Sequence, residues 1–321
     1  MEDYALAVLS ATFGVLCLLL RHHRRRRRTA VAPSLYTLPN GTEVWHLRAS
    51  ETRLLYDDIW RGGYLVGDAA APFSLVLSDG DVIVDVGANV GLFATWIAEQ
   101  AERLRIFSFE PIPTTFKVLQ LNAALLQRKG SAVVTLERGL SDVAGEVTMH
   151  HHRNMSIWSS MNAEVDRARA AMLLRDVDHA ASRAMAQISS KRRRWLTNCV
   201  PTCVVRCFAR AFLSSLDEIE SIRCVFETLS TEPTLRDVGK IHLVKIDVEG
   251  AELQVLRGIS DRDWLRIEQL TIEVENAAIE EEIVAMLEAR GYDIYAWQNA
   301  ELKELLPHCD VRQVIARKRS N

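Results

Sequence analysis

The sequence predicts an α/β fold in which a mostly parallel sheet carries helices on both faces. Short runs rich in Val and Ile alternate with longer helical stretches from residue 81 to the C-terminus, apart from one long interruption. A glycine-containing turn follows the first of these runs directly. Strand–helix alternation of this kind is typical of parallel sheets whose crossover helices cover both faces. Hydrophobic content of 48% and charged content of 25% are those of a globular domain with a buried core.

Seven strands and five helices are expected, each bounded by Gly, Pro or polar residues. The strands are expected at 82–86, 105–110, 132–136, 241–246, 269–274, 292–297 and 311–316. The helices are expected at 51–60, 92–101, 114–126, 251–256 and 278–290, with Pro111 and Pro113 before the third and Gly258 and Gly291 ending the last two.

The N-terminus shows the clearest change in composition. Residues 4–20 are almost wholly apolar, and residues 21–28 then contain six arginines. As a helix, the apolar run would span about 25 Å, slightly less than the hydrocarbon core of a bilayer. The arginines favour a membrane anchor at 1–28 with the following domain in the cytosol, and an organelle-targeting segment is the alternative. We expect a linker at 29–50 and one domain at 51–321.

The charge distribution argues against nucleic acid as a partner. The net formal charge is −3 although six arginines lie within residues 21–28, so the rest of the chain is acidic on balance. An acidic surface does not attract a phosphate backbone. The six cysteines do not resemble a disulfide framework in a chain of this length, and the Cys199, Cys203 and Cys207 spacing more readily fits an apolar element than a metal site.

The interruption between residues 150 and 240 is expected to contain an inserted helical cap at about 150–205. No glycine occurs between Gly145 and Gly239, and Ala, Arg, Met and Leu dominate 163–187. These residues favour helix, and loops of this length without secondary structure are uncommon.

The turn at Asp85–Gly91 lies where an open α/β sheet binds nucleotides, at the carboxyl end of its first strand. Its spacing is G-x-x-x-G, which differs from the G-x-G-x-x-G of dinucleotide-binding proteins, and no phosphate-binding Lys follows. Glu110, at the end of the second strand, is placed to accept hydrogen bonds from both hydroxyls of a ribose. Asp142, after the third strand, could contact an adenine edge or could simply belong to a turn.

Four motifs in order resemble the FkbM family of methyltransferases. They are Asp79–Phe93, Phe109–Pro111, Leu140–Asp142 and Val244–Glu252, the last including Lys245-Ile246-Asp247-Val248-Glu249-Gly250. Ser215-Leu216-Asp217 is similar to the family's segment before the fourth strand. The resemblance implies a Rossmann-like class I methyltransferase fold that uses S-adenosylmethionine. It also implies that the cofactor is lined by Asp85, Gly87, Ala88, Asn89, Gly91, Glu110 and Asp142.

Methyl transfer to a hydroxyl requires a group that takes up the hydroxyl proton. Asp247 and Glu249 are the candidate catalytic residues, because they follow the fourth strand close to the expected position of the methyl group. Together with Glu252 and with Glu273 or Glu275 they could form a cluster that holds a base or a divalent metal. Acids at a helix start also favour the helix dipole without any ligand, and no metal is assigned. His150–His152 could supply the base instead, although a solvated loop is the favoured interpretation there.

The sequence therefore predicts a membrane-anchored O-methyltransferase that acts on a small-molecule, sugar or lipid-like acceptor. A non-catalytic, membrane-anchored scaffold that retains the fold is the alternative.

Overall fold

The computed structural model describes residues 32–60, 74–152, 159–161, 219–298 and 310–319. The chain divides into two units, Met1–Ser34 and Leu35–Asn321. Nearly all of the first unit, including the predicted anchor at 4–20, lies outside the described residues. Within the described ranges, no helix has both the length and the apolar character that a membrane crossing requires.

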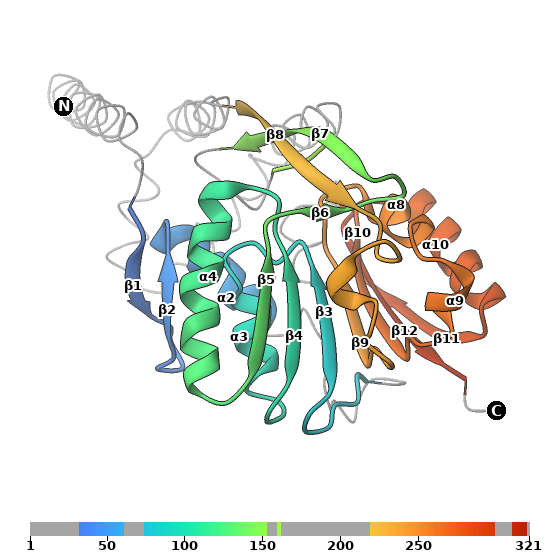
Figure 1. Cartoon of the computed structure of the whole chain (residues 1–321), viewed down its shortest axis with the longest axis horizontal. Helices are drawn as coiled ribbons and strands as arrows, with labels where there is room; N and C mark the ends of the chain where they lie inside the picture. The colour runs from blue at the N-terminus through green and yellow to red at the C-terminus, as the bar shows by residue number, and fades with distance from the viewer. Residues whose placement is uncertain (1–31, 61–73, 153–158, 162–218, 299–309, 320–321) are drawn as a thin grey trace, which may run out of the picture. The chain divides into compact units, whose positions relative to one another are not determined.

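A seven-stranded sheet organises the second unit (Figure 1). Its strands are β3 (Val82–Val86), β4 (Arg105–Phe109), β5 (Ala132–Leu136), β9 (Leu243–Ile246), β10 (Gln269–Val274), β11 (Tyr292–Trp297) and β12 (Arg312–Lys318). The order across the sheet is β11-β12-β10-β9-β3-β4-β5. All neighbours are parallel except β12, which is antiparallel to both β10 and β11. The predicted mostly parallel sheet is confirmed.

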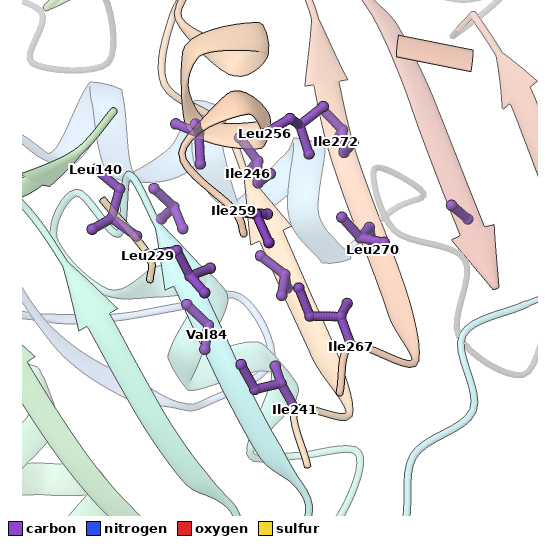
Figure 2. Packing of buried hydrophobic residues seen from close by; sticks show 14 of the residues in the cluster. Val84, Leu140, Leu229, Ile241, Ile246, Leu256, Ile259, Ile267, Leu270 and Ile272 are labelled. Carbon is purple, nitrogen blue, oxygen red and sulfur yellow. The ribbon is translucent and has the colours of Figure 1, made fainter. Parts of the chain in front are cut away.

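Helices cover both faces of this sheet, as the alternating pattern predicts. They are α2 (Ala49–Asp58), α3 (Leu92–Ile97), α4 (Pro113–Arg128), α8 (Glu252–Arg257), α9 (Asp261–Trp264) and α10 (Ala277–Ala289). Ile83 packs in a buried cluster with residues of α2, α3 and α4. Its neighbour Val84 points to the opposite face and packs with residues of α8, α9 and α10 (Figure 2). Helix α3 ends at Ile97, four residues before the predicted end.

The region expected as a linker, 29–50, contains ordered structure from residue 32 onward. Strands β1 (Ser34–Thr37) and β2 (Glu43–His46) form a two-stranded sheet. Leu38 and Val44 are only 2% and 1% exposed and belong to the same cluster as α3. Pro39 and Gly41 lie in the turn between these strands, where Gly41 has a φ of 89°.

A second sheet of three strands borders the interruption. It has the order β6-β8-β7, with β6 at Gly139–Leu140, β7 at Gly145–His152 and β8 at Ile219–Glu227. Strands β7 and β8 are antiparallel, and His152 lies opposite Ile219. The two residues that flank 153–218, His152 and Ile219, therefore lie side by side. Most of the predicted helical cap at 150–205 lies outside the described residues, and its first three residues belong to β7.

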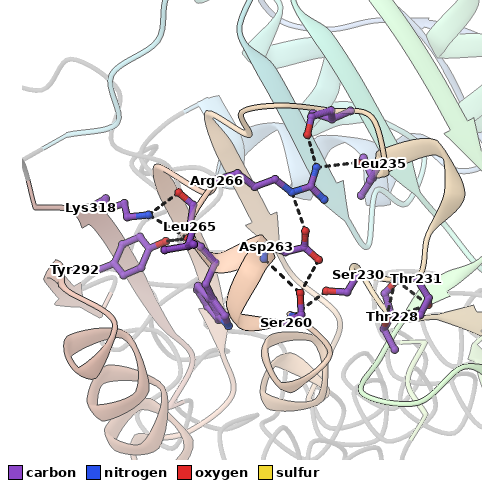
Figure 3. A network of polar contacts seen from close by, with 12 residues as sticks. Thr228, Ser230, Thr231, Leu235, Ser260, Asp263, Leu265, Arg266, Tyr292 and Lys318 are labelled. Atoms are coloured by element: carbon purple, nitrogen blue, oxygen red, sulfur yellow. Dashed lines mark hydrogen bonds and ion pairs between the residues drawn. The ribbon is translucent and has the colours of Figure 1, made fainter.

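A polar network fixes the crossover that leads into β9 and β10 (Figure 3). The Arg266 guanidinium donates to the carbonyl oxygens of Leu235 and Val238 and to the Asp263 carboxylate. Leu235 ends the short 3-10 helix η3 (Pro233–Leu235), which precedes β9. The Tyr292 hydroxyl donates to the carbonyl oxygen of Ile267 at 2.8 Å. These bonds give the carbonyl oxygens of Leu235, Val238 and Ile267 side-chain donors, which tie η3 and the loop before β10 together.

Candidate active site

A buried polar row crosses the centre of the large sheet near the carboxyl ends of its parallel strands. In the strand register Ser108 lies opposite Asp85, Asp85 opposite Lys245, and Lys245 opposite Thr271. All four side chains are at most 3% exposed. The chain order reverses between β3 and β9, which carry Asp85 and Lys245. In open α/β sheets this topological switch point is where ligands bind.

Lys245 is the charged centre of this row. Its Nζ donates to the Gly87 carbonyl oxygen at 2.8 Å and lies 3.4 Å from Asp85 Oδ1 and 3.2 Å from Asp247 Oδ2. Burial alone would lower the pKa of Lys245, but the carboxylates of Asp247 and Asp85 raise it overall. Burial raises the pKa of Asp85, and Lys245 opposes this effect. The lysine therefore compensates buried negative charge and holds the start of the glycine turn.

Lys245 lies within the motif at Val244–Glu252, but the sequence alone assigns it no role. The available signal was a lysine inside a four-residue strand, Leu243–Ile246, that is buried along its whole length. A buried lysine requires a compensating acid, and Asp247 lies two residues further along the same strand direction.

The turn after β3 has a backbone that only a few residue types adopt readily. Gly87, Asn89 and Gly91 have φ values of 77°, 50° and 86°. A Cβ on Gly87 would lie 1.8 Å from the carbonyl oxygen of Asp247, and one on Gly91 would lie 2.8 Å from Leu119 Cδ1. The first glycine thus allows the turn to pack directly against the end of β9, and the second allows close approach of α4.

Glu110 joins the two loops that follow β3 and β4. Its carboxylate accepts hydrogen bonds from the backbone N–H groups of Asn89 at 3.0 Å and Ile112 at 2.9 Å. The side chain is 6% exposed, and burial raises its pKa to about 7 in spite of these bonds. Each carboxylate oxygen accepts one of these bonds and retains a lone pair, so the two oxygens can also accept hydrogen bonds from the two hydroxyls of a ribose. The predicted position of Glu110 beside the glycine turn is the one observed.

The remaining predicted cofactor residues lie around this turn. The Ala88 backbone N–H donates to the Phe109 carbonyl oxygen at 2.9 Å, which ties the turn to β4. Asp142 is exposed between β6 and β7 and accepts from Ser141 Oγ at 3.1 Å. Gly258 packs against that loop, since a Cβ there would lie 2.1 Å from the Ser141 carbonyl oxygen.

Acidic side chains gather around Asp247 at the ends of β9 and β10. Asp247 is 27% exposed, and Glu249 follows it with a φ of 57°. Burial, followed by the charges of Asp247 and Asp58, raises the pKa of Glu273 well above its usual value. Partial desolvation and the charge of Asp247 raise the pKa of Asp58 to about 6. Asp58 comes from α2, outside every motif, and sequence analysis missed it.

Glu252 lies at the start of α8, beside the same acids. Its Oε1 accepts from the Gly250 N–H at 2.8 Å, and its Oε2 is buried without a hydrogen-bond partner. Burial raises the pKa of Glu252 to about 7. Among the described residues no three His, Cys, Asp or Glu side chains are arranged to hold a metal ion.

The expectation of a solvated loop at His150–His152 is wrong. These residues end β7, and His151 and His152 are 4% and 6% exposed. His151 Nδ1 lies 3.0 Å from Ser159 Oγ, and its Nε2 lies 3.4 Å from Thr114 Oγ1. The strand pairs with β8, a partner that the sequence does not reveal, and Thr114 of α4 and Ser159 lie against the His151 ring.

The strand order, the glycine turn after β3 and the acid after β4 together define a class. The sheet has seven strands, of which only β12 is antiparallel, and these groups lie at its switch point. This arrangement is that of a Rossmann-like methyltransferase that uses S-adenosylmethionine. The acidic surroundings of the turn suit this cofactor, because its sulfonium and amino groups are cationic.

Comparison with known proteins agrees with this class. Residues 209–294 match the model of the methyltransferase FkbM domain. The chain is 29% identical over 283 residues to the 31-O-demethyl-FK506 methyltransferase FkbM of Streptomyces tacrolimicus, which covers 88% of this chain and 95% of that protein. It is 28% identical to methyltransferase sdnD of Sordaria araneosa over 66% of this chain and 73% of the relative.

Among solved structures, an FkbM methyltransferase from Methylobacillus flagellatus aligns with a TM-score of 0.42 and 13% identity, over 75% of this chain and 44% of that one. The chain is a methyltransferase, and both its motifs and these relatives are similar to the FkbM type.

Proposed function

We propose that the chain transfers the methyl group of S-adenosylmethionine to a hydroxyl oxygen of a small-molecule acceptor. The observation that carries this proposal is the partly exposed carboxylate of Asp247, held by Lys245 beside the glycine turn and surrounded by acids whose pKa values are raised. A hydroxyl is a poor nucleophile until its proton is taken up, and a carboxylate in such surroundings is suited to that task. The relative from Streptomyces tacrolimicus is named for an acceptor that lacks an O-methyl group.

The cofactor supplies an electrophilic methyl group on a sulfonium, which is a good leaving group. The residues of this chain contribute binding and proton transfer. Glu110 accepts hydrogen bonds from the ribose hydroxyls, and the Asp85–Lys245 pair holds the glycine turn in place. Asp247 takes up the proton of the substrate hydroxyl and aligns the hydroxyl oxygen with the methyl group. Glu249, on the following turn, borders the bound substrate.

The raised pKa values around Asp247 support a proton-accepting role. The charge of Asp247 contributes to the raised pKa of both Asp58 and Glu273, so the Asp247 carboxylate lies among groups that hold protons more readily than usual.

Transfer of labelled methyl from S-adenosylmethionine to a panel of hydroxyl-bearing small molecules tests the proposal. The panel contains macrolides that lack one O-methyl group, sugars and hydroxylated lipids. Asp247→Asn should abolish transfer and preserve S-adenosylhomocysteine binding, because it removes the base and keeps the shape. Saturable binding with no transfer to any hydroxyl acceptor would contradict O-methylation and favour a scaffold.

We also propose that residues 4–20 anchor the chain in a membrane with the domain in the cytosol. The apolar run followed by six arginines supports this orientation. Fractionation of cells that produce the full chain or a variant without residues 1–28 tests it. Only the full chain should sediment with membranes, and a shortened chain that stays with them would contradict the anchor.

A further inference from the structure

The carboxamide of Asn122 connects the glycine turn to the N-terminal hairpin. Asn122 lies in α4 and is 1% exposed. Its Nδ2 donates to the Val90 carbonyl oxygen at 2.7 Å and to the Trp45 carbonyl oxygen at 2.9 Å. Its Oδ1 accepts from the Trp45 backbone N–H at 2.6 Å. Both donors and the acceptor of one buried side chain are thus used for backbone groups of two distant segments.

The Val90 carbonyl lies at the most constrained point of the turn. Val90 is between Asn89 and Gly91, both of which have positive φ. Its backbone N–H donates to Asn89 Oδ1 at 2.7 Å, and Asn89 in turn donates its own N–H to Glu110. A shift of the Val90 carbonyl would have to be absorbed within the two residues that separate it from the Asn89 N–H, which is bound to the Glu110 carboxylate. Asn122 opposes such a shift because its Nδ2 holds the Val90 carbonyl oxygen.

On the hairpin, Asn122 binds a single residue, Trp45. Asn122 pairs with both backbone groups of Trp45 in β2, in the manner of a neighbouring strand. Val44 beside it is 1% exposed and packs in the cluster that contains Val90 and Leu92. The hairpin is therefore packed and hydrogen-bonded onto the outside of the cofactor turn.

We propose that Asn122 is a positioning residue for S-adenosylmethionine, and that it makes the β1–β2 hairpin a structural part of the cofactor site. Asn122 acts through the backbone of Val90, which fixes Asn89 and thereby Glu110. The proposal rests on the cofactor site described above. It implies reciprocity: cofactor binding stabilises the hydrogen bonds of Trp45, and loss of these bonds weakens cofactor binding.

The test combines titration calorimetry with amide hydrogen exchange on the full chain, with S-adenosylhomocysteine as the probe. In the wild type, S-adenosylhomocysteine should slow exchange in the peptide that contains residues 43–47. Asn122→Leu should weaken binding by about tenfold or more, because fewer molecules have the competent turn, and should abolish this distant protection. Asn122→Asp keeps the acceptor for Trp45 N–H but loses both donors, and should weaken binding similarly.

Gln127→Ala is the matched control. Gln127 lies in the same helix and donates one hydrogen bond, at 2.8 Å, to the Val133 carbonyl in β5, away from the turn. The Gln127→Ala variant should have a lower melting temperature but unchanged S-adenosylhomocysteine affinity and unchanged exchange protection at residues 43–47. If Asn122 has only a structural role, Asn122→Leu and Gln127→Ala should lose S-adenosylhomocysteine affinity equally. That result would overturn the proposal.

The wild type alone decides the matter if the Asn122 variants do not fold. Saturable S-adenosylhomocysteine binding without any change of exchange at 43–47 would overturn this inference and leave the cofactor assignment intact. Absence of binding in the folded wild type would overturn both.

Discussion

Gly87→Ala is the substitution that most directly examines how the glycine turn is built. An added Cβ would lie 1.8 Å from the Asp247 carbonyl oxygen and 2.9 Å from its carbon, both of which are backbone atoms of a central strand end. Neither atom can rotate away as the tip of a flexible side chain can. The turn or the end of β9 must therefore shift, and both carry groups of the proposed active site.

Two costs combine at this position. The φ of 77° costs an alanine about 1–2 kcal/mol relative to glycine. Relief of the backbone overlap adds about 1–3 kcal/mol, as for overpacking in a dense interior. The free energy of unfolding should therefore fall by about 2–5 kcal/mol, and S-adenosylhomocysteine affinity should fall with it.

Gly80→Ala separates the two costs. Gly80 has a φ of 84°, and a Cβ there would meet nothing within 4 Å. It should lose only the conformational contribution of about 1–2 kcal/mol and keep its affinity. Urea unfolding and titration calorimetry of both variants provide the comparison. Equal stability and equal affinity in the two variants would refute the close packing of the turn against Asp247.

Three further predictions concern charge. Lys245→Met should lower the free energy of unfolding by about 3–5 kcal/mol, because Asp85 would then lack its cation. In urea unfolding, the double variant Lys245→Met with Asp85→Asn should recover part of the lost stability. An equal loss of stability in the single and the double variant would contradict the pairing. The pKa of Glu252 is raised when the chain folds, so its contribution to stability is present below its usual value of 4.5 and is lost as pH rises through about 7. Glu252→Gln should therefore flatten the decline in stability across that window, and an unchanged slope would count against burial of the protonated acid. Glu110→Gln should weaken S-adenosylhomocysteine binding at least about tenfold in calorimetry, since it removes a charged hydrogen-bond acceptor, whereas wild-type affinity in this variant would exclude Glu110 from the cofactor site.

Much of the fold could be predicted because its signals are local. Runs such as Val82–Val86 are apolar and β-branched, and parallel strands buried on both faces have this composition. The turn at Gly87, Asn89 and Gly91 can also be recognised in the sequence, because few residue types readily adopt a positive φ. Glu110 could be expected beside this turn because parallel strands end at the same edge of a sheet.

The elements that were missed depend on partners distant in the sequence. The β1–β2 hairpin has few residues, and its strand character comes from packing of Val44 on a core supplied by residues 83–126. His151 belongs to a strand paired with β8, about seventy residues further along the chain, and its ring contacts Thr114 and Ser159, so its short polar run alone suggested a solvated loop. The residues of β8 alternate between exposed and more buried positions, but nothing in either segment specifies which strand is its partner.

The sequence by itself determined the class of this protein: the strand pattern, the glycine turn, Glu110 and the acids after β9 are each encoded within a few consecutive residues. Only the tertiary structure decided how their charges are balanced and held. Lys245 compensates Asp85 because β3 and β9 pair in register, Asp58 reaches the acidic cluster from α2, and Asn122 binds the turn to the hairpin. The physical reason is that pKa values and buried hydrogen bonds depend on distances of a few ångströms between segments, which local composition does not specify.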